Sequence, residues 1–313
     1  RRRFPGYDIR FRRSQLQGES YTSMAIHPSG GDIALTMDLE ALFDRFRNDL
    51  YLGNPMKAIE REIKEAVAQM PQFDTEALTN YERMKEKLTL QLVPAAKNKD
   101  LLADIPHRNI EDMALVYRFD MGQNERTSSS ILVTNKMLNA YGIPAAQLHD
   151  DALEAASHSC PATLRNMNEV IHNMAGQTDP SPMWVASIEN GQNGACVIQY
   201  PHFLDDAAET LGGSFYVLPS SIHEVLLLAD DTSPSLSELE NMVRTINQAE
   251  VAPEERLSDN VFHYDCESHI FENARTFEAR QSAVEQSVAN AELFEAAKPD
   301  TMTVLLVQPM RHA

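Results

Sequence analysis

The chain contains no long hydrophobic run, although hydrophobic residues make up 43% of its 313 residues. A helix that crosses a membrane needs about 18 or more consecutive apolar residues. The longest apolar runs here, at 225–229 and 304–307, have the length of strands. A secretory signal is missing as well, because the basic residues at the start are followed by polar sequence. The first residue is not Met, which fits a trimmed or processed chain, and we predict a cytoplasmic protein without a membrane span.

Cysteine is scarce, and the common motifs of nucleotide and hydrolase sites are absent. Cys160, Cys196 and Cys266 form no Cys-x-x-Cys pair, so we interpret them as reduced, buried thiols rather than as a zinc site or a redox centre. Gly212 and Gly213 lack the Gly-x-Gly-x-x-Gly or Gly-Lys-Ser/Thr context of a nucleotide loop. No Gly-x-Ser-x-Gly elbow of a serine hydrolase occurs. The sequence therefore predicts no cofactor.

Negative charge dominates the chain, with a formal net charge of -19 at pH 7. Such a protein repels phosphate backbones, which argues against general nucleic-acid binding. A basic protein surface remains open as a partner, and so does mimicry of nucleic acid. The first thirteen residues are the exception, because they contain six arginines. These form either a basic arm for an acidic partner or a solvated edge strand that the arginines protect from edge-to-edge pairing.

The hydrophobic pattern predicts an α+β fold, in which amphipathic helices pack on mixed antiparallel sheets. We expect strands at 7–12, 21–26, 32–35, 214–218, 222–228 and 303–307, and hairpins that join 113–119 to 129–133 and 183–188 to 195–200. Helices are expected at 39–50, 56–70, 74–88, 134–142, 144–156, 164–174, 201–211, 235–246 and 272–297. Ser235 and Glu238 form the pattern of a capping box. With soft boundaries, we predict N-terminal strands plus a helical region at 1–105, an α+β core at 106–270, and a C-terminal helix and strand at 271–313.

Several short segments carry a resemblance to a known family. The most specific is Leu-Pro-Ser-Ser-Ile-His-Glu at 218–224, and others lie at 105–107, 112–117, 194–201, 248–255 and 257–259. These segments resemble a bacterial family called domain of unknown function 5688. The matches run from roughly residue 35 to 265, and neither the arginine-rich start nor the tail beyond Glu267 is expected from the family. The resemblance implies a bacterial, cytoplasmic protein linked to mobile elements, and it carries over no catalytic or binding residue.

Ser220, Ser221, His223 and Glu224 are the first candidate catalytic residues. Serine, histidine and a carboxylate together can supply a nucleophile, a base and an orienting acid. In an extended strand, however, His223 and Glu224 point to opposite faces. The alternative is a turn in which the serine hydroxyls bond local backbone groups and His223 is hydrogen-bonded beneath them.

His263, Asp265 and His269 are the second candidate set, with Cys266 and Glu267 nearby. These residue types can bind zinc or iron, but their spacing matches no standard metal motif. The alternative is a polar strand end with a buried thiol. A third group, His202 with Asp205 and Asp206, lies in the first turn of an expected helix, where acids complement the helix dipole without any further function.

We predict that the protein has a non-enzymatic protein-binding or regulatory role linked to a mobile element. The acidity of the chain and the lack of a catalytic signature support this prediction, because an acidic surface steers basic partners. One alternative is a hydrolase that uses His223 with Ser220 or Ser221. Another is an acidic nucleic-acid mimic or inhibitor, which requires carboxylates in rows on one face.

Overall fold

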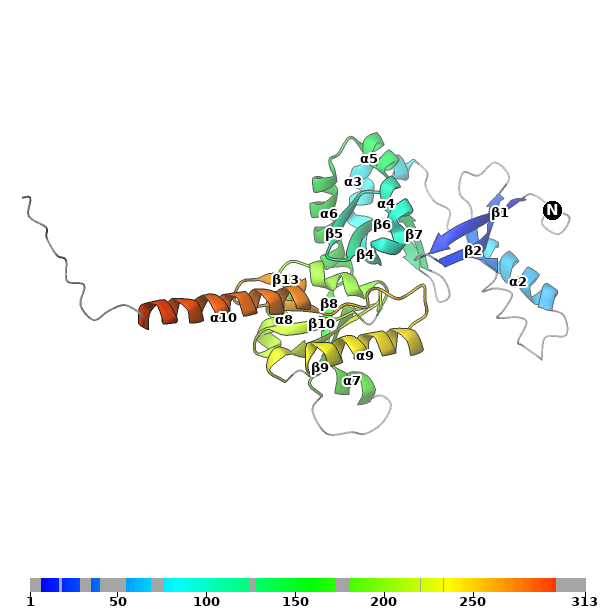
Figure 1. The fold of residues 1–313 in the computed structure, drawn as a ribbon. Coiled ribbons are helices and arrows are strands. Elements are labelled where there is room, and N and C mark those ends of the chain that lie inside the picture. The colour runs from blue at the N-terminus through cyan, green and yellow to red at the C-terminus, as the bar shows by residue number, and fades with distance from the viewer. Residues whose placement is uncertain are drawn as a thin grey trace, which may run out of the picture.

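The computed structural model describes residues 7–16, 19–28, 35–39, 55–68, 76–123, 128–172, 181–219, 221–232 and 234–296. In this part of the chain the strands form three antiparallel sheets, and helices pack against them (Figure 1). This arrangement confirms the predicted α+β class. The helix expected at 39–50 and the strand expected at 303–307 lie almost entirely outside the described residues.

The N-terminal sheet has three strands in the order β1-β2-β3: β1 (Tyr7–Leu16), β2 (Glu19–Pro28) and β3 (Leu35–Asp38). One helix, α2 (Pro55–Ala68), follows it. Ile59 and Ile63, one turn apart on this helix, share a buried cluster with Met24 and Ile26 of β2. The sheet and α2 therefore have a small hydrophobic core of their own.

The second sheet has four strands, with the long strand β6 at its centre. β4 pairs with one side of β6, while β5 and β7 pair with successive parts of the other side. The strands are β4 (Leu88–Pro94), β5 (His107–Ile110), β6 (Met113–Gln123) and β7 (Ser128–Leu132). The helical segments of this unit are η1 (Ala77–Thr79), α3 (Tyr81–Met84), η2 (Lys85–Lys87), η3 (Ala96–Asn98), α4 (Lys99–Asp104), α5 (Asn135–Tyr141) and α6 (Ala145–Ser159). Residue 105, where a soft boundary was predicted, lies between strands of this one sheet.

The third sheet has six strands in the order β13-β12-β10-β11-β9-β8. Its strands are β8 (Ala162–Asn166), β9 (Met183–Ile188), β10 (Phe215–Leu218), β11 (Val225–Ala229), β12 (Phe262–Asp265) and β13 (Ile270–Asn273). The helical segments of this unit are α7 (Met167–His172), η4 (Gly194–Gln199), α8 (Phe203–Leu211), η5 (Asp230–Thr232), α9 (Leu236–Ala249) and α10 (Ala274–Ala296).

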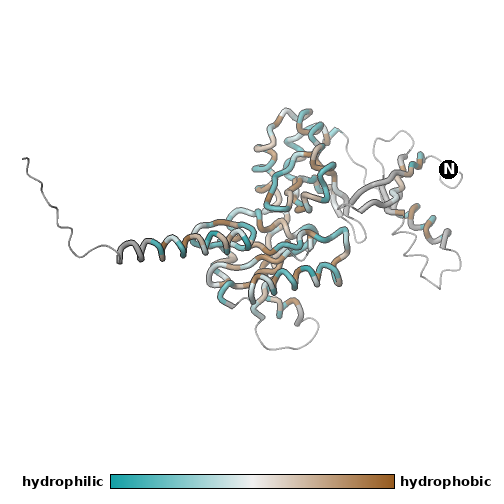
Figure 2. Tube along the Cα trace, in the orientation of Figure 1, coloured by the Kyte–Doolittle hydropathy of each residue, from teal (hydrophilic) through white to brown (hydrophobic). Residues whose placement is uncertain are grey.

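Both faces of the six-stranded sheet are buried, because alternate residues of its central strands enter different cores. Tyr216 and Leu218 of β10 belong to the cluster that contains Leu239 and Val243 of α9. Phe215 and Val217 belong to the main core, which also contains residues of the four-stranded sheet. Figure 2 shows hydrophobic residues gathered in these strands, with hydrophilic residues frequent on the outer helices.

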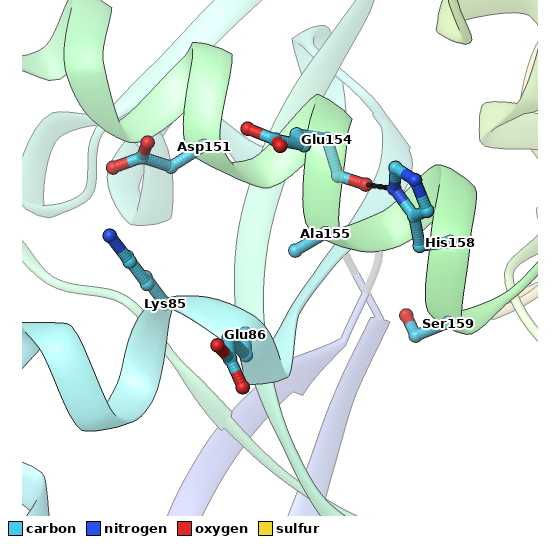
Figure 3. A pocket seen from close by; sticks show the side chains of 7 residues that line it. All are labelled: Lys85, Glu86, Asp151, Glu154, Ala155, His158 and Ser159. Carbon is cyan, nitrogen blue, oxygen red and sulfur yellow. Dashed lines mark hydrogen bonds between the residues drawn. The ribbon is translucent and has the colours of Figure 1, made fainter.

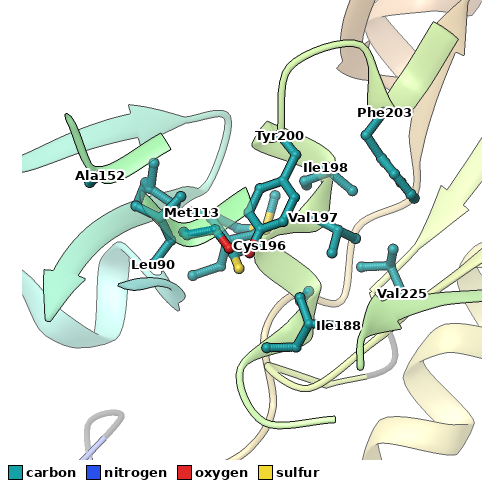
Figure 4. Close-up of a cluster of buried hydrophobic side chains, with 14 of the residues drawn as sticks. Leu90, Met113, Ala152, Ile188, Cys196, Val197, Ile198, Tyr200, Phe203 and Val225 are labelled. Carbon is teal, nitrogen blue, oxygen red and sulfur yellow. Dashed lines mark hydrogen bonds between the residues drawn. The ribbon is translucent and has the colours of Figure 1, made fainter. Parts of the chain in front are cut away.

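The short helix η4 lies in the seam between the two larger sheets. Five of its six residues, from Gly194 to Ile198, are buried. Figure 4 shows Cys196 and Tyr200 close to Leu90 and Met113 of the four-stranded sheet, with Ile188 and Val225 on the other side. This segment was expected to be the second strand of a hairpin, and that prediction was wrong. The apolar residues of η4 are surrounded by core residues of both sheets. Strand β9 pairs with β8 and β11 instead.

Three other predictions need correction. The helix expected at 74–88 is broken into η1, α3 and η2, and Leu88 begins β4. The helix expected at 164–174 is the strand β8 followed by the single turn of helix α7. Strand β11 begins at Val225 rather than at residue 222. In each case the apolar residues are buried as expected, but pairing with a distant strand decides the backbone conformation.

The predicted helix ends are confirmed at several positions. Thr134 caps α5 by accepting a hydrogen bond from the N–H of Met137, and Gly142 ends this helix in the left-handed conformation. The capping box of Ser235 and Glu238 forms at the start of α9.

We predict that Gly194→Ala lowers the free energy of unfolding by about 1–3 kcal/mol or more, as in other overpacked cores. A Cβ atom on Gly194 would lie 2.5 Å from the carbonyl oxygen of His223 and 2.7 Å from the backbone nitrogen of Ile188, and neither backbone can move freely. Gly213→Ala is the matched control, because its Cβ would meet no atom within 4 Å. Urea unfolding of both variants checks this prediction, and equal stabilities would contradict it.

Candidate functional site

Segments that carry the family resemblance meet around His223. The N–H of Ala195 donates to the carbonyl of Ile222 at 3.2 Å, and the N–H of Ile222 donates to the carbonyl of Glu255 at 2.9 Å. Thus the segments at 194–201, 218–224 and 248–255, which are far apart in sequence, share one site. We call Asn193, Ala195, Ile222, His223 and Glu255 the His223 junction.

The ring of His223 has a protein partner at each nitrogen. Nδ1 accepts a hydrogen bond from the N–H of Asn193 at 3.1 Å, which places the proton of the neutral ring on Nε2. Nε2 lies 3.5 Å from a carboxylate oxygen of Glu255. The carbonyl of His223 accepts a hydrogen bond from the hydroxyl of Ser187 at 2.7 Å. His223 therefore holds the residue before η4 through its ring and strand β9 through its backbone.

The predicted catalytic residues Ser221, His223 and Glu224 lie close together, but the hydrogen bonds between them involve backbone groups rather than two side chains. The hydroxyl of Ser221 accepts a hydrogen bond from the N–H of His223 at 3.0 Å, and the N–H of Ser221 donates to the carbonyl of Glu224. Among the residues that the structure describes, no hydrogen bond joins the Ser221 hydroxyl to the His223 ring. Ser220 lies outside these residues. The geometry matches the turn that was the alternative for this sequence.

A second set of hydrogen bonds links the two larger sheets near residue 112. The carboxylate of Asp112, in the turn between β5 and β6, accepts hydrogen bonds from the Ser258 hydroxyl at 2.7 Å and from the Asn260 side chain at 2.8 Å. Asn247 of α9 donates to the carbonyl of Ser258 at 2.8 Å. Two more of the family-like segments, at 112–117 and 257–259, are therefore in direct contact.

The residues proposed as metal ligands lie on opposite faces of β12. His263 and Asp265 face α10, whereas Tyr264 and the neighbouring His269 face α8. Within the described part of the chain, no group of three or more His, Cys, Asp and Glu side chains could hold a metal ion. The spacing of two residues brings His263 and Asp265 to one face as predicted, but the turn after β12 carries His269 to the other face.

His263 packs against the first turn of α10. Its side chain is fully buried and stacks on the ring of Phe277, with ring centroids 3.6 Å apart. Its Nε2 lies 3.3 Å from a carboxylate oxygen of Asp230, and its edge contacts Tyr216. The histidine therefore connects β12 to α10 and to the end of β11.

Asp265 forms an ion pair with Arg280 of α10. The two groups are 3.1 Å apart, and Arg280 also bonds Glu272 at 2.7 Å. Burial would raise the pKa of Asp265, but hydrogen bonds from Ser268, Arg280 and the N–H groups of Glu267 and Ser268 outweigh it and bring the pKa to about 2. Asp265 is thus a charged anchor for α10.

His269, Asp205 and Tyr264 form a hydrogen-bonded cluster on the other face. The carboxylate of Asp205 accepts a hydrogen bond from the Tyr264 hydroxyl and lies 2.7 Å from Nδ1 of His269. The hydroxyl of Tyr264 and the imidazole of His269 lower the pKa of Asp205. His269 and His202 both adopt left-handed backbone conformations, with φ of 55° and 63°. This cluster ties the turn after β12 to the first turn of α8.

A groove of about 500 Å³ lies between η2 and α6 (Figure 3). Lys85, Glu86, Asp151, Glu154 and His158 contribute its charged and titratable side chains. Asp151 also accepts a hydrogen bond from the buried hydroxyl of Tyr81 at 2.6 Å, while Lys85 forms an ion pair with Glu82. Asp151 therefore has a hydrogen-bond donor from the protein, whereas the cation of the groove is paired with Glu82, which does not line it.

The cysteines are free thiols. Cys196 is buried in η4, and Cys160 and Cys266 are half-buried. Burial raises the pKa of Cys196 to about 12, so this thiol is protonated at neutral pH and is a poor nucleophile.

Comparison with known families gives a match over most of the chain. The model of a family of unknown function, DUF5688, matches residues 6–266. The chain belongs to the DUF5688 family. The DUF5688 match includes most of the arginine-rich start, which was expected to lie outside it, and stops before β13 and α10. No curated protein and no solved structure matches the chain.

Among the helices in the described ranges, none has both the length and the hydrophobicity that a membrane span requires.

Several residues that shape these sites were not singled out from the sequence. Asn193 and Glu255 lie in loops that only the fold brings to His223, and Asp205 was explained by the helix dipole alone. Its partners Tyr264 and His269 are about sixty residues away in sequence. No local pattern indicates such contacts.

We predict that His223→Ala destabilises the fold by about 1 kcal/mol or more, because the N–H of Asn193 loses its acceptor. His223→Asn is the control, since its side-chain oxygen lies near the position of Nδ1. Urea unfolding should rank the proteins wild type, His223→Asn, His223→Ala in falling stability. An equal loss in the two variants would show that the hydrogen bond to Asn193 contributes nothing.

The lowered pKa of Asp265 predicts a pH dependence. Because the folded-state pKa of about 2 lies below the ordinary value of 3.8, the stabilisation is complete above pH 4 and is lost as the pH falls toward 2. We expect Asp265 to account for about 2 kcal/mol of the acid-induced loss of stability. Unfolding of wild type and Asp265→Asn between pH 5 and pH 2 measures it. Asp231→Asn, at an exposed aspartate, should keep the wild-type slope.

Proposed function

We propose that this chain is a non-enzymatic protein-binding module, and that the far part of α10 binds a basic amphipathic helix of a partner protein. The observation that carries this proposal is the exposure of two valines. Val284 and Val288 are each 53% exposed on a 23-residue helix that projects from the body (Figure 1). Isolated exposed valines are ordinary, but these two lie one turn apart on the same helix face.

The first two turns of α10 are firmly anchored. Arg275 forms two hydrogen bonds with Glu240 of α9, at 2.6 and 2.7 Å. Phe277 stacks on His263, and Arg280 bonds Asp265 and Glu272. These contacts hold the helix in a fixed direction. A preorganised helix loses less conformational entropy on binding than a disordered segment does.

Beyond Arg280 the helix offers a free surface. Every residue from 282 to 290 is exposed. The sequence from 281 to 296 contains glutamates but no Lys or Arg, and Glu278 and Glu285, seven residues apart, lie along one side of the valine face. An apolar stripe beside a row of acids is complementary to a helix with apolar and basic residues. A second copy of this part of α10, which carries the same glutamates, would lack that complementarity.

The alternatives have less support from the geometry. A hydrolase needs a nucleophile that faces the His223 ring, whereas the Ser221 hydroxyl bonds the backbone N–H of His223. A nucleic-acid mimic needs carboxylates in rows on one face, and several acids of this chain are paired with arginines instead.

Position-specific cross-linking in the native host tests the proposal. A photo-reactive amino acid at 284 or 288 should give adducts several-fold more abundant than the same residue at 282 or 286, on the opposite side of the helix. The cross-linked peptide should be rich in Lys and Arg and amphipathic, and added salt should reduce the yield. Absent adducts, equal yields at all four positions, or adducts only with another copy of this chain would contradict the proposal.

A further inference from the structure

A small pocket of about 50 Å³ lies between the four-stranded sheet and the loop that leads from β9 to η4. Arg118 and Asp120 of β6, Thr89 of β4 and Ser130 of β7 line its sheet side, and Asn190 and Gln192 line its loop side. Asn193 at the end of the loop is held by the His223 ring. The His223 junction therefore positions one wall of this pocket.

Arg118 is the cation of this pocket. Its Nε donates to the hydroxyl of Ser130 at 2.8 Å, and one terminal nitrogen donates to the side-chain oxygen of Gln91 at 3.4 Å. A guanidinium has five N–H donors, so the remaining donors have no protein acceptor within the described ranges. Both acceptors are neutral. Arg275 and Arg280, by contrast, are paired with carboxylates.

We propose that this pocket binds a phosphate-sized oxyanion that carries a proton, with Arg118 as its positive ligand. Arg118 is half-buried in the wall of the pocket, and this burial lowers the pKa of its guanidinium. A half-buried guanidinium that bonds only neutral acceptors has donors left for an anion, and an oxyanion can accept them through bidentate N–H···O bonds.

The other lining groups complete the coordination of an oxyanion. The Ser130 oxygen accepts from Arg118, so its hydroxyl hydrogen is available to the ligand. Asn190 uses its side-chain oxygen to accept from the N–H of Gln192 at 2.9 Å, which leaves its amide donors available. The pocket, at about 50 Å³, is too small for a nucleotide, because sites for ligands of that size class have volumes of about 300–1,000 Å³.

Asp120 determines which oxyanion fits. One of its carboxylate oxygens accepts from the N–H of Gly122 at 2.8 Å, and the other has no partner among the described residues. A carboxylate repels a fully ionised anion but accepts a hydrogen bond from one that retains a proton. Phosphate retains a proton at neutral pH, whereas sulfate does not. The site should therefore select phosphate over sulfate.

Isothermal titration of the full chain with inorganic phosphate and with sulfate, at pH 7 and equal ionic strength, tests the proposal. Wild type should bind one phosphate and no sulfate. Arg118→Gln should weaken phosphate binding by about tenfold or more, the loss expected for charge-assisted hydrogen bonds. Asp120→Asn should allow sulfate to bind. Arg83→Gln, at an exposed position of α3, is the control and should bind phosphate as wild type does.

Each other result overturns the proposal. Wild type that binds no phosphate, or Arg118→Gln that binds it unchanged, shows that Arg118 holds no anion. Equal binding of phosphate and sulfate by wild type indicates an adventitious ion only and removes the role of Asp120. If Arg118→Gln does not fold, Ser130→Ala takes its place, with weaker phosphate binding expected and unchanged binding as the contradicting result.

Discussion

The close approach of Gly194 to the backbone of His223 and Ile188 is the constraint on which the central arrangement depends. No side chain fits at this point, so η4 can enter the seam between the two larger sheets. Its apolar residues then complete the main core from both sides. Buried backbone groups need hydrogen-bond partners. Around His223, the Ser187 hydroxyl donates to the carbonyl of His223, the N–H of Asn193 donates to its ring, and the N–H of Ala195 donates to the carbonyl of Ile222. The packing of the four-stranded sheet on the six-stranded sheet thus depends on the turn that contains His223.

Contacts that support the fold also explain the polar residues that resembled catalytic or metal sites. His223 supports η4, while His263 and Asp265 of β12 anchor α10. Hydrogen bonds satisfy the Asp265 carboxylate and the Nδ1 atom of His223, whose desolvation would otherwise destabilise the fold. His263 is held by stacking on Phe277 and by Asp230 at Nε2, while its buried Nδ1 has no hydrogen-bond partner among the described residues. These residues are therefore explained by the structure of the protein, and a histidine beside a carboxylate is not by itself a catalytic signal. The functional proposals rest instead on groups that the fold leaves unsatisfied or exposed.

Two features of this kind, the far part of α10 and the pocket at Arg118, differ in charge and in position. The far part of α10 presents apolar and acidic side chains to solvent, beyond the region that the DUF5688 family model matches. Arg118 is a half-buried cation inside that region, and its pocket shares Asn193 with the His223 junction. A partner that binds α10 would use a part of the chain outside the match, whereas an anion at Arg118 would use the shared fold. The two proposals can fail independently.

The sequence by itself determined the α+β class, most helix positions and caps, the strands β6, β7, β9 and β10, and the family. The fold class, the helices and the strands depend on periodicity and on local hydrogen bonds, which neighbouring residues decide. The family was inferred from the resemblance of short segments. The sequence also indicated that His263 and Asp265 share a face. Only the tertiary structure decided that 195–199 is helical, that 88–94 and 162–166 are strands, and that Asn193, Glu255 and Asp205 complete the polar clusters. The physical reason is that a short apolar run is compatible with helix or strand, and contacts between distant segments select one of them.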